Sequence, residues 1–137
     1  MRVVGVDLGT KRIGVAVSDP TGTLASPHSV LERSGDQSAD HRRLADLVAE
    51  VAAERVVVGL PLSLDGRMGP AAEATAAEAE ALAAVVGVPV ETCDERLTTV
   101  SAQQALRAGG TPGRRQRAVI DKVAAAVLLQ SWLDANR

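Results

Sequence analysis

The alternation of hydrophobic and polar segments along the chain predicts five strands, three of which come in succession at the start. Two short apolar runs separated by a glycine-containing turn are typical of a hairpin, and a third extended segment follows them. An unbroken β-branched run near the middle of the chain is typical of a strand covered on both faces. The predicted strands are residues 2–8, 12–18, about 24–32, 55–60 and 88–92.

The helical spacing of apolar residues, together with start and stop signals, predicts four helices. The first lies behind Ser38, which is its predicted N-cap, and the second ends at Gly87. Three glycines and three arginines over residues 109–117 predict a mobile basic loop before the last helix. The predicted helices are residues 38–53, 71–86, from Thr98 or Thr99 to Ala108, and about 118–135, the last with Ile120, Val123, Ala124, Val127 and Leu128 on one face. This order of elements indicates a mixed sheet with helices packed on it.

Length and composition indicate one domain with an aliphatic core. The chain has 137 residues, of which 46% are hydrophobic, and Trp132 is its only aromatic residue. A chain of this size buries roughly two-thirds of its surface on folding, so it needs no metal or disulfide to be stable. We therefore expect a single domain over residues 1–137. The single cysteine, Cys93, excludes an intrachain disulfide and a cysteine-based structural zinc site.

The charge balance excludes attraction of the whole molecule to nucleic acid. The formal net charge is −2, so any nucleic-acid binding has to use local basic patches. Thirteen of the fifteen basic residues are arginine, which reflects either genomic base composition or phosphate recognition. No apolar run approaches the roughly 18 residues of a membrane span, and the first residues do not form a signal peptide. We expect a soluble, cytoplasmic protein.

Three acidic residues stand where strands end or a helix begins. Asp7 lies near the end of the first strand, Glu95 just past the fifth, and Asp121 in an otherwise apolar first turn of the last helix. Each has a simple explanation by itself: a turn cap, a surface ion cluster, or a complement to the helix dipole. If the three carboxylates converge, however, their repulsion requires a cation between them. Mg²⁺ or Mn²⁺, as a pair of ions, would suit oxygen ligands and would activate water for phosphodiester hydrolysis.

Basic residues near these acids would then hold the phosphate backbone of a nucleic acid. A zinc site does not compete, because His28, His41 and Cys93 lack the spacing of zinc ligands. The predicted phosphate-binding residues are Lys11, Arg12, Arg96, Arg114, Arg115 and Arg117.

Four segments together resemble the YqgF/RuvX family, in order and over the whole chain. These proteins are RNase H-like nucleases, described as Holliday junction resolvases and as nucleases that mature the 5′ end of the small-subunit ribosomal RNA precursor. The segments are residues 6–16 (Val-Asp-Leu-Gly-Thr-Lys-Arg-Ile-Gly-Val-Ala), 57–61 with Asp65-Gly66, 94–99 (Asp-Glu-Arg-Leu-Thr-Thr), and Asp121 with Ala124-Ala125.

The resemblance implies an α/β, RNase H-like fold with a five-stranded mixed sheet whose first three strands are antiparallel. It also implies that Asp7, Glu95 and Asp121 are the catalytic acids and bind divalent metal for in-line hydrolysis. The expected activity is that of a metal-dependent nuclease, a hydrolase that leaves 5′-phosphate and 3′-hydroxyl ends. The expected role is 5′-end processing of pre-16S rRNA in ribosome biogenesis, and the alternative is Holliday junction resolution in DNA recombination and repair.

Two positions depart from the family pattern. Ser63 stands where relatives often have asparagine, which puts a loop contact in doubt. Cys93 stands where a bulkier residue commonly precedes the Asp-Glu-Arg segment. Its thiol would be buried and inert, or else sensitive to oxidation, or able to link two chains; the first interpretation is favoured.

Other functions remain open at this point. The Asp-Leu-Gly-Thr segment also resembles the first phosphate loop of the actin, chaperone and sugar-kinase superfamily, but that superfamily binds ATP between two domains, each about the size of this chain. A non-catalytic RNA-binding or transcription-regulating factor is a further alternative, disfavoured by the three acids. With a single aromatic residue, recognition should depend on backbone charge and shape, in structured RNA or branched DNA. We expect a monomer or weak homodimer.

Overall fold

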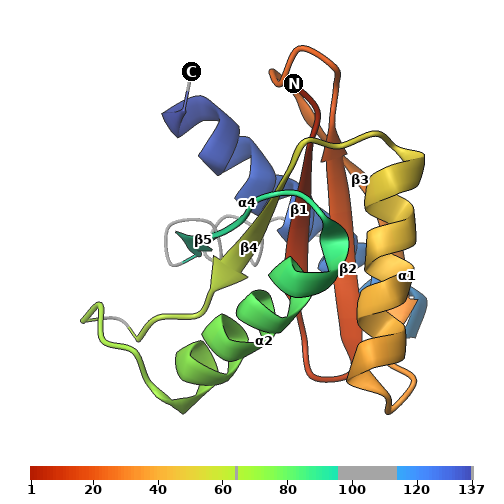
Figure 1. Cartoon of the computed structure of the whole chain (residues 1–137). Helices are drawn as coiled ribbons and strands as arrows, with labels where there is room; N and C mark the ends of the chain where they lie inside the picture. The colour runs from red at the N-terminus through yellow and green to blue at the C-terminus, as the bar shows by residue number, and fades with distance from the viewer. Residues whose placement is uncertain (64, 96–113, 137) are drawn as a thin grey trace.

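The computed structural model describes residues 1–63, 65–95 and 114–136, with backbone alone for residues 114–119. Its core is one five-stranded sheet in the order β3-β2-β1-β4-β5 (Figure 1). β1 pairs antiparallel with β2, and β2 antiparallel with β3, whereas β4 runs parallel to both β1 and β5. The strands are β1 (Val3–Leu8), β2 (Arg12–Ser18), β3 (Ala25–Glu32), β4 (Arg55–Leu60) and β5 (Val90–Asp94). The mixed sheet with three antiparallel strands at one side is therefore confirmed.

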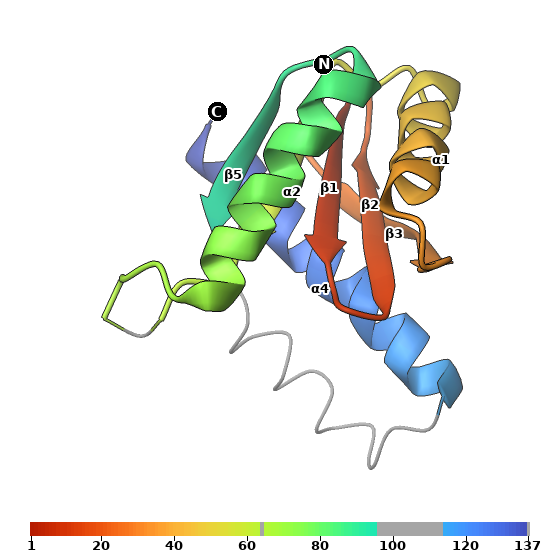
Figure 2. The same ribbon diagram turned by 60° about the horizontal axis from the view of Figure 1, so that its bottom comes forward.

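Helices cover both faces of the sheet, which makes three layers. α1 (Gln37–Glu50) and α2 (Pro70–Val86) pack side by side on one face, and α4 (Arg114–Ala135) crosses the other face (Figures 1 and 2). Side chains along β1 alternate between the two faces of the sheet. Val4 and Val6 pack in the core under α1 and α2, and Val3 packs in the core under α4. A strand covered in this way has to be apolar on both sides, as the sequence of β4 predicts.

The ends of the helices follow capping chemistry, and one helix start and one strand start differ from prediction. The N-cap of α1 is Asp36 rather than Ser38, because the Asp36 carboxylate accepts a hydrogen bond from the amide of Ala39. α2 ends as predicted at Gly87, which adopts the left-handed conformation with φ of 73°. The fifth strand runs from Val90 to Asp94 and so begins two residues later than predicted.

The last helix differs most from its prediction. It begins at Arg114, so residues 114–117 are helical and not part of a loop, and the predicted helix over 98–108 lies outside the described residues. The face that α4 buries is also shifted around the helix. Of the five residues predicted to form this face only Leu128 is fully buried, and the other buried positions are Ala125, Leu129 and Leu133. α4 is apolar on several sides, so its periodicity alone did not identify the buried one.

Among the helices of the described ranges, none is long and apolar enough to cross a membrane.

Candidate active site

A row of two glycines and one aspartate crosses three neighbouring strands on the face under α4. Gly14 of β2 pairs directly with Asp7 of β1. On the other side of β1, Gly59 follows Val58, which pairs with Val6. The missing side chains on both sides of Asp7 leave room on this face of the sheet, and the two other predicted acids occupy that room.

Glu95 and Asp121 sit directly over these glycines. A Cβ placed on Gly59 would lie 2.6 Å from Oε2 of Glu95, and a Cβ on Gly14 would lie 2.1 Å from the main-chain oxygen of Asp121. Glu95 reaches this position because its amide donates to the carbonyl of Leu60, which continues the pairing of β5 with β4 by one residue. Three acids that are far apart in the sequence are thus brought to one place on the sheet.

Asp7 is the central acid, and its electrostatics reflect the arrangement. Burial raises the pKa of the Asp7 carboxyl from 3.8 to about 6, and the negative charge of Asp121 adds to the rise. None of the ion pairs within the described part of the chain involves Asp7. A half-buried carboxyl group in this state favours either a proton or a bound cation.

Glu95 shows the same effect. Burial, together with the negative charges of Asp7 and Asp94, raises its pKa from 4.5 to about 7. A carboxyl group whose pKa is raised by a neighbouring carboxylate is typical of sites that bind a cation or share a proton.

Asp121 differs, because an arginine neutralises it. Nε of Arg12 donates a hydrogen bond of 2.7 Å to Oδ2 of Asp121, and this interaction raises the pKa of the guanidinium. Arg12 was predicted to bind phosphate; in this structure it is paired with a candidate catalytic acid. In keeping with this pairing, no group of three His, Cys, Asp or Glu side chains among the described residues is arranged to hold a metal ion.

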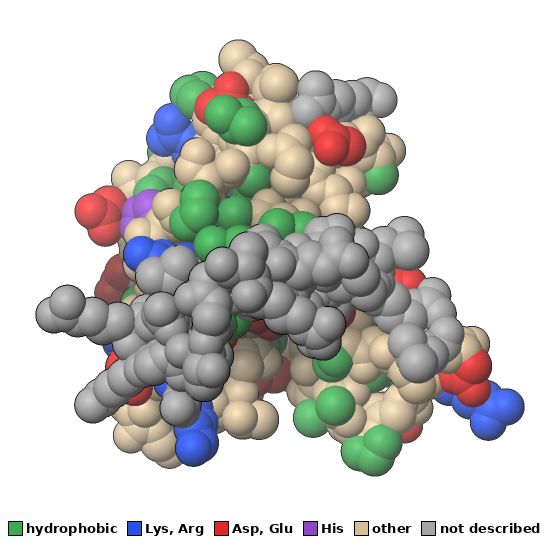
Figure 3. Space-filling view, turned by 180° about the vertical axis from the view of Figure 1, so that it is seen from behind, with side chains coloured by type: hydrophobic (Ala, Val, Ile, Leu, Met, Phe, Trp, Pro, Cys, Tyr) green, Lys and Arg blue, Asp and Glu red, His purple; other side chains and the backbone are tan. Residues whose placement is uncertain are grey.

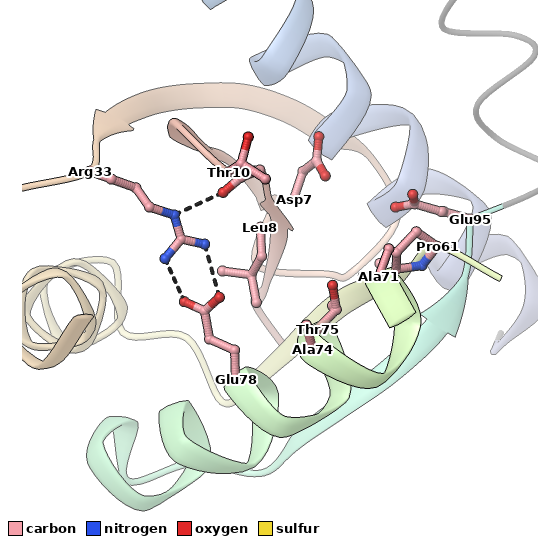
Figure 4. A pocket seen from close by; sticks show the side chains of 12 residues that line it. Asp7, Leu8, Thr10, Arg33, Pro61, Ala71, Ala74, Thr75, Glu78 and Glu95 are labelled. Carbon is pink, nitrogen blue, oxygen red and sulfur yellow. Dashed lines mark hydrogen bonds and ion pairs between the residues drawn. The ribbon is translucent and has the colours of Figure 1, made fainter. Parts of the chain in front are cut away.

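A cavity of about 500 Å³ opens beside these acids at the carboxyl ends of β1 and β4. Asp7 and Glu95 line one end of it, and Arg33 and Glu78 line the other (Figure 4). Its remaining walls come from the turn after β1, from the segment after β4 and from α2: Leu8, Gly9, Thr10, Gly59, Pro61, Ala71, Ala74 and Thr75.

An ion-pair network that the sequence analysis missed supports the far end of the cavity. Arg33 donates two parallel hydrogen bonds, of 2.8 and 2.9 Å, to Glu78, which also pairs with His41 at 2.8 Å. Nε of Arg33 donates to the carbonyl of Gly9, and its amide donates to the carbonyl of Lys11. The network therefore joins the turn after β1 to both α1 and α2. The available signal was the position of His41, one turn before Leu44 on the buried face of α1.

Burial alone would raise the pKa of Glu78. The hydrogen bonds from Arg33 and His41 outweigh it, so the pKa lies below its ordinary value. Glu78 is thus ionised at neutral pH and fully engaged as an acceptor, which assigns it a structural role at the cavity.

The other predicted phosphate-binding residues are only partly placed. Lys11 is exposed in the turn after β1, Arg96 lies outside the described residues, and Arg114, Arg115 and Arg117 lie at the start of α4 with side chains that are not described. On the face seen from behind, the basic side chains that are coloured form separate spots with acidic ones between them (Figure 3). The positive charge of the described surface in this view is thus local.

The structure shows the contacts of Ser63 and Cys93, the two residues that depart from the family pattern. The hydroxyl of Ser63 donates to Asp65 at 2.6 Å and closes a turn in which the Gly66 amide donates to the Ser63 carbonyl, so serine itself supplies a loop contact. Cys93 is half-buried against the core under α4, and burial raises the pKa of its thiol, to which the charges of Asp94 and Glu91 contribute. A raised pKa favours the unreactive thiol.

The chain is similar to known proteins over nearly its whole length. Residues 1–135 match the family model "RuvX: Holliday junction resolvase". A protein of Mycobacterium sp. (strain KMS) named "Putative pre-16S rRNA nuclease" is 53% identical over 137 residues, which are 99% of this chain and 81% of that one. A protein of the same name from Mycobacterium leprae (strain Br4923) is 54% identical over 138 residues, 99% of this chain and 74% of that one.

Solved structures with low sequence identity share the fold. RuvC of Thermus thermophilus, in a complex with a Holliday junction substrate, superimposes with a TM-score of 0.61 at 16% identity and covers 99% of this chain and 95% of that chain. RuvC of the same organism in a second structure gives a TM-score of 0.57 at 18% identity, with coverage of 99% and 96%. The RNase H-like fold is thereby confirmed. With a family match over nearly all its residues and relatives above 50% identity, the chain belongs to the RuvX family.

Proposed function

We propose that this protein is a divalent-metal-dependent nuclease that hydrolyses phosphodiester bonds of structured nucleic acid, and that its substrate is the 5′ end of pre-16S rRNA. The observation that carries the proposal is that Asp7, Glu95 and Asp121 lie beside the glycine row on one face of the sheet. Family membership and the names of the mycobacterial relatives support the same activity and favour RNA.

The residues present fit one or two Mg²⁺ or Mn²⁺ ions. Their donors are carboxylate oxygens, which these ions prefer. The raised pKa values of Asp7 and Glu95 mark an excess of negative charge that a cation would relieve. Asp7, Glu95 and Asp121 would hold the metal, with Asp121 exchanging its contact with Arg12 for the ion. When bound, the metal would activate a water molecule and stabilise the leaving oxygen.

The remaining parts of the site act on the substrate. Arg12, once released from Asp121, and Lys11 in the adjacent turn would hold phosphate oxygens of the substrate. The network of Arg33, Glu78 and His41 keeps that turn in position. Glu95, with a pKa raised to about 7, is suited to accept or release a proton near neutral pH until a cation lowers its pKa.

Resolution of Holliday junctions is the second candidate, because the family model carries that description and the fold is that of RuvC. Symmetric cleavage of a junction needs two active sites, hence a dimer, whereas trimming an RNA end needs one. We expect a monomer or weak dimer, and a mass measurement in solution tests this part of the proposal.

The deciding experiment offers the purified protein a pre-16S rRNA fragment and a synthetic four-way junction in parallel, with Mg²⁺, Mn²⁺ or EDTA. We expect cleavage of the RNA that requires metal, and its loss in Asp7→Asn. Asp46→Asn, at an exposed position of α1, is the matched control and should keep full activity. Undiminished cleavage by the Asp7 variant, or equal cleavage in EDTA, would overturn the assignment.

A further inference from the structure

One wall of the cavity carries a threonine hydroxyl group that has no hydrogen-bond partner among the described residues. Thr75 of α2 is 9% exposed, and its side chain rises from the helix toward the side of the cavity where Leu8 and Asp7 lie (Figure 4). Within the described part of the chain, no hydrogen bond involves its hydroxyl. Among the described residues, the fully buried side-chain polar atom without a partner is Nε of Arg2, so the Thr75 hydroxyl is open to the space of the cavity. A hydroxyl group in this position is free to donate a hydrogen bond to a ligand in the cavity and to accept one from it.

The helix that carries Thr75 presents its positive end to the same space. Ala71, in the first turn of α2, lines the cavity, and the N-cap Gly69 has no side chain to occupy the free amides of that turn. Such a helix start favours a negatively charged group, and phosphate is a common one. Arg33 adds a guanidinium group at the far end of the cavity, and only three of its five N–H groups are used by Gly9 and Glu78.

The size and lining of the cavity favour a sugar and phosphate over a stacked base. Its volume of about 500 Å³ lies within the roughly 300–1,000 Å³ typical of small-ligand sites, so it accepts one nucleotide unit and not a duplex. Its lining residues include no aromatic ring for stacking. The short side chains of Ala71 and Ala74 leave space along the α2 side of the cavity. Thr10 and Thr75 supply hydroxyl groups to its lining.

We propose that this cavity holds the sugar and phosphate of the nucleotide next to the cleaved bond, and that the Thr75 hydroxyl recognises the 2′-hydroxyl of that sugar. Both hydroxyl groups donate and accept, so they pair in either direction, and the 2′-hydroxyl is the group that distinguishes RNA from DNA. The position of the cavity beside Asp7 and Glu95 places such a sugar next to the reacting phosphate. This inference rests on the proposed nuclease function, and it makes Thr75 the residue that selects RNA over DNA.

The test compares Thr75→Val, which keeps the shape and removes the hydroxyl, with Thr75→Ser, which restores it. The substrates are an RNA oligonucleotide with one cleavage site and matched oligonucleotides with a single 2′-deoxy sugar at each position around that site. The wild-type protein should cleave one of the 2′-deoxy substrates about 3–10-fold less efficiently than RNA, the factor expected of one hydrogen bond. Thr75→Val should cleave RNA and that 2′-deoxy substrate equally, at the lower rate, while Thr75→Ser should regain most of the difference.

A variant that fills the space supplies an independent check. Ala74→Leu places a large side chain in the cavity and should raise KM for RNA, whereas Ala77→Leu, at an exposed position of the same helix outside the cavity lining, should not. Thermal unfolding of each variant separates lost folding from lost recognition.

Binding measurements distinguish failure of this inference from failure of the proposed function. The dissociation constants of wild type and Thr75→Val for the RNA and for the all-deoxy strand are measured in EDTA, where no cleavage is expected. The wild-type protein could cleave neither substrate and still bind RNA more tightly than the all-deoxy strand. If Thr75→Val then binds both strands equally, the proposed nuclease function is wrong and the proposed role of Thr75 is supported. An unchanged ratio of RNA to deoxy substrate in Thr75→Val, in cleavage or in binding, would overturn the inference.

Discussion

Asp7→Asn should make the protein more stable while it removes the activity. The carboxyl group of Asp7 is half-buried and near Asp121, so its ionised form is disfavoured and its pKa rises from 3.8 to about 6. Because the folded protein binds the proton more tightly than the unfolded chain, ionisation of this group costs stability as the pH rises from about 4 to about 6, and the full cost remains above that. Asparagine has nearly the same shape and no charge, so the variant avoids the cost.

The size of the effect follows from the two pKa values. The difference between 3.8 and about 6 corresponds to about 3 kcal/mol at pH 8, and water at the half-buried carboxylate reduces this to roughly 2–3 kcal/mol. At pH 4 the difference between the two proteins should be only about 0.5 kcal/mol, because Asp7 is then largely protonated in the folded protein. For a domain of 137 residues, 2–3 kcal/mol raises the Tm by roughly 6–10 °C.

The assay is urea unfolding of wild type and Asp7→Asn at pH 4 and pH 8, in EDTA, with Asp46→Asn as the control for loss of an acid at an exposed position. Other carboxyl groups titrate in both proteins and largely cancel in the difference. A gain for Asp7→Asn of the same size at both pH values, or a loss of stability at pH 8, would refute the claim that burial and neighbouring charge disfavour the Asp7 carboxylate.

Three further predictions follow from other parts of the structure. Gly14→Ala should destabilise the protein by at least about 2 kcal/mol in urea unfolding, since its Cβ would lie 2.1 Å from the main-chain oxygen of Asp121 in α4. The control is Gly69→Ala, where a Cβ meets nothing within 4 Å, and it should cost less than about 1 kcal/mol. Similar losses in both variants would contradict the claim that α4 packs closely on the glycine row. Arg33→Lys should lose about 1–3 kcal/mol at pH 7 because lysine cannot make both hydrogen bonds to Glu78. Because the pKa of Glu78 is depressed from 4.5, the stability that its ionised form contributes is present above that pH and is lost on acidification. The difference in unfolding free energy between wild type and Arg33→Lys should therefore become smaller below pH 4. A difference that does not change with pH would show that it does not come from the ion pair. RNA affinity should fall steeply between 50 and 200 mM salt in a binding titration, with a slope of about −0.7 per phosphate contacted on single strands, and a flat dependence would count against recognition through backbone charge.

Much of the fold follows from local patterns in the sequence. The unbroken apolar run of β4 predicts a doubly covered strand, and Val56, Val57 and Val58 are all fully buried. Gly87 predicts the end of α2 for the same local reason, because a left-handed C-cap favours glycine. The start of α1 was missed by two residues, since Asp36 and Ser38 are both good N-caps and only the hydrogen bond to Ala39 distinguishes them.

The site could be predicted only in part. The residue types of Asp7, Glu95 and Asp121 suggested metal chemistry, but each also had an ordinary explanation until the strand order brought them together. The pairing of Arg12 with Asp121 joins residues 109 positions apart, and no local pattern reports such a contact. That Thr75 lines a cavity could likewise not be predicted, since a threonine in an alanine-rich helix has no local signal that distinguishes it.

The sequence by itself determined which segments are strands and helices, that the core is aliphatic, and which acids are candidates for catalysis, because these depend on side-chain chemistry and on spacing along the chain. The tertiary structure alone decided that glycines of β2 and β4 flank Asp7, that an arginine binds one of the three acids, and that a cavity lined by a threonine hydroxyl adjoins the other two. Those properties arise from burial and from contacts between segments that are distant in the sequence, so they are formed only when the helices have packed on the sheet.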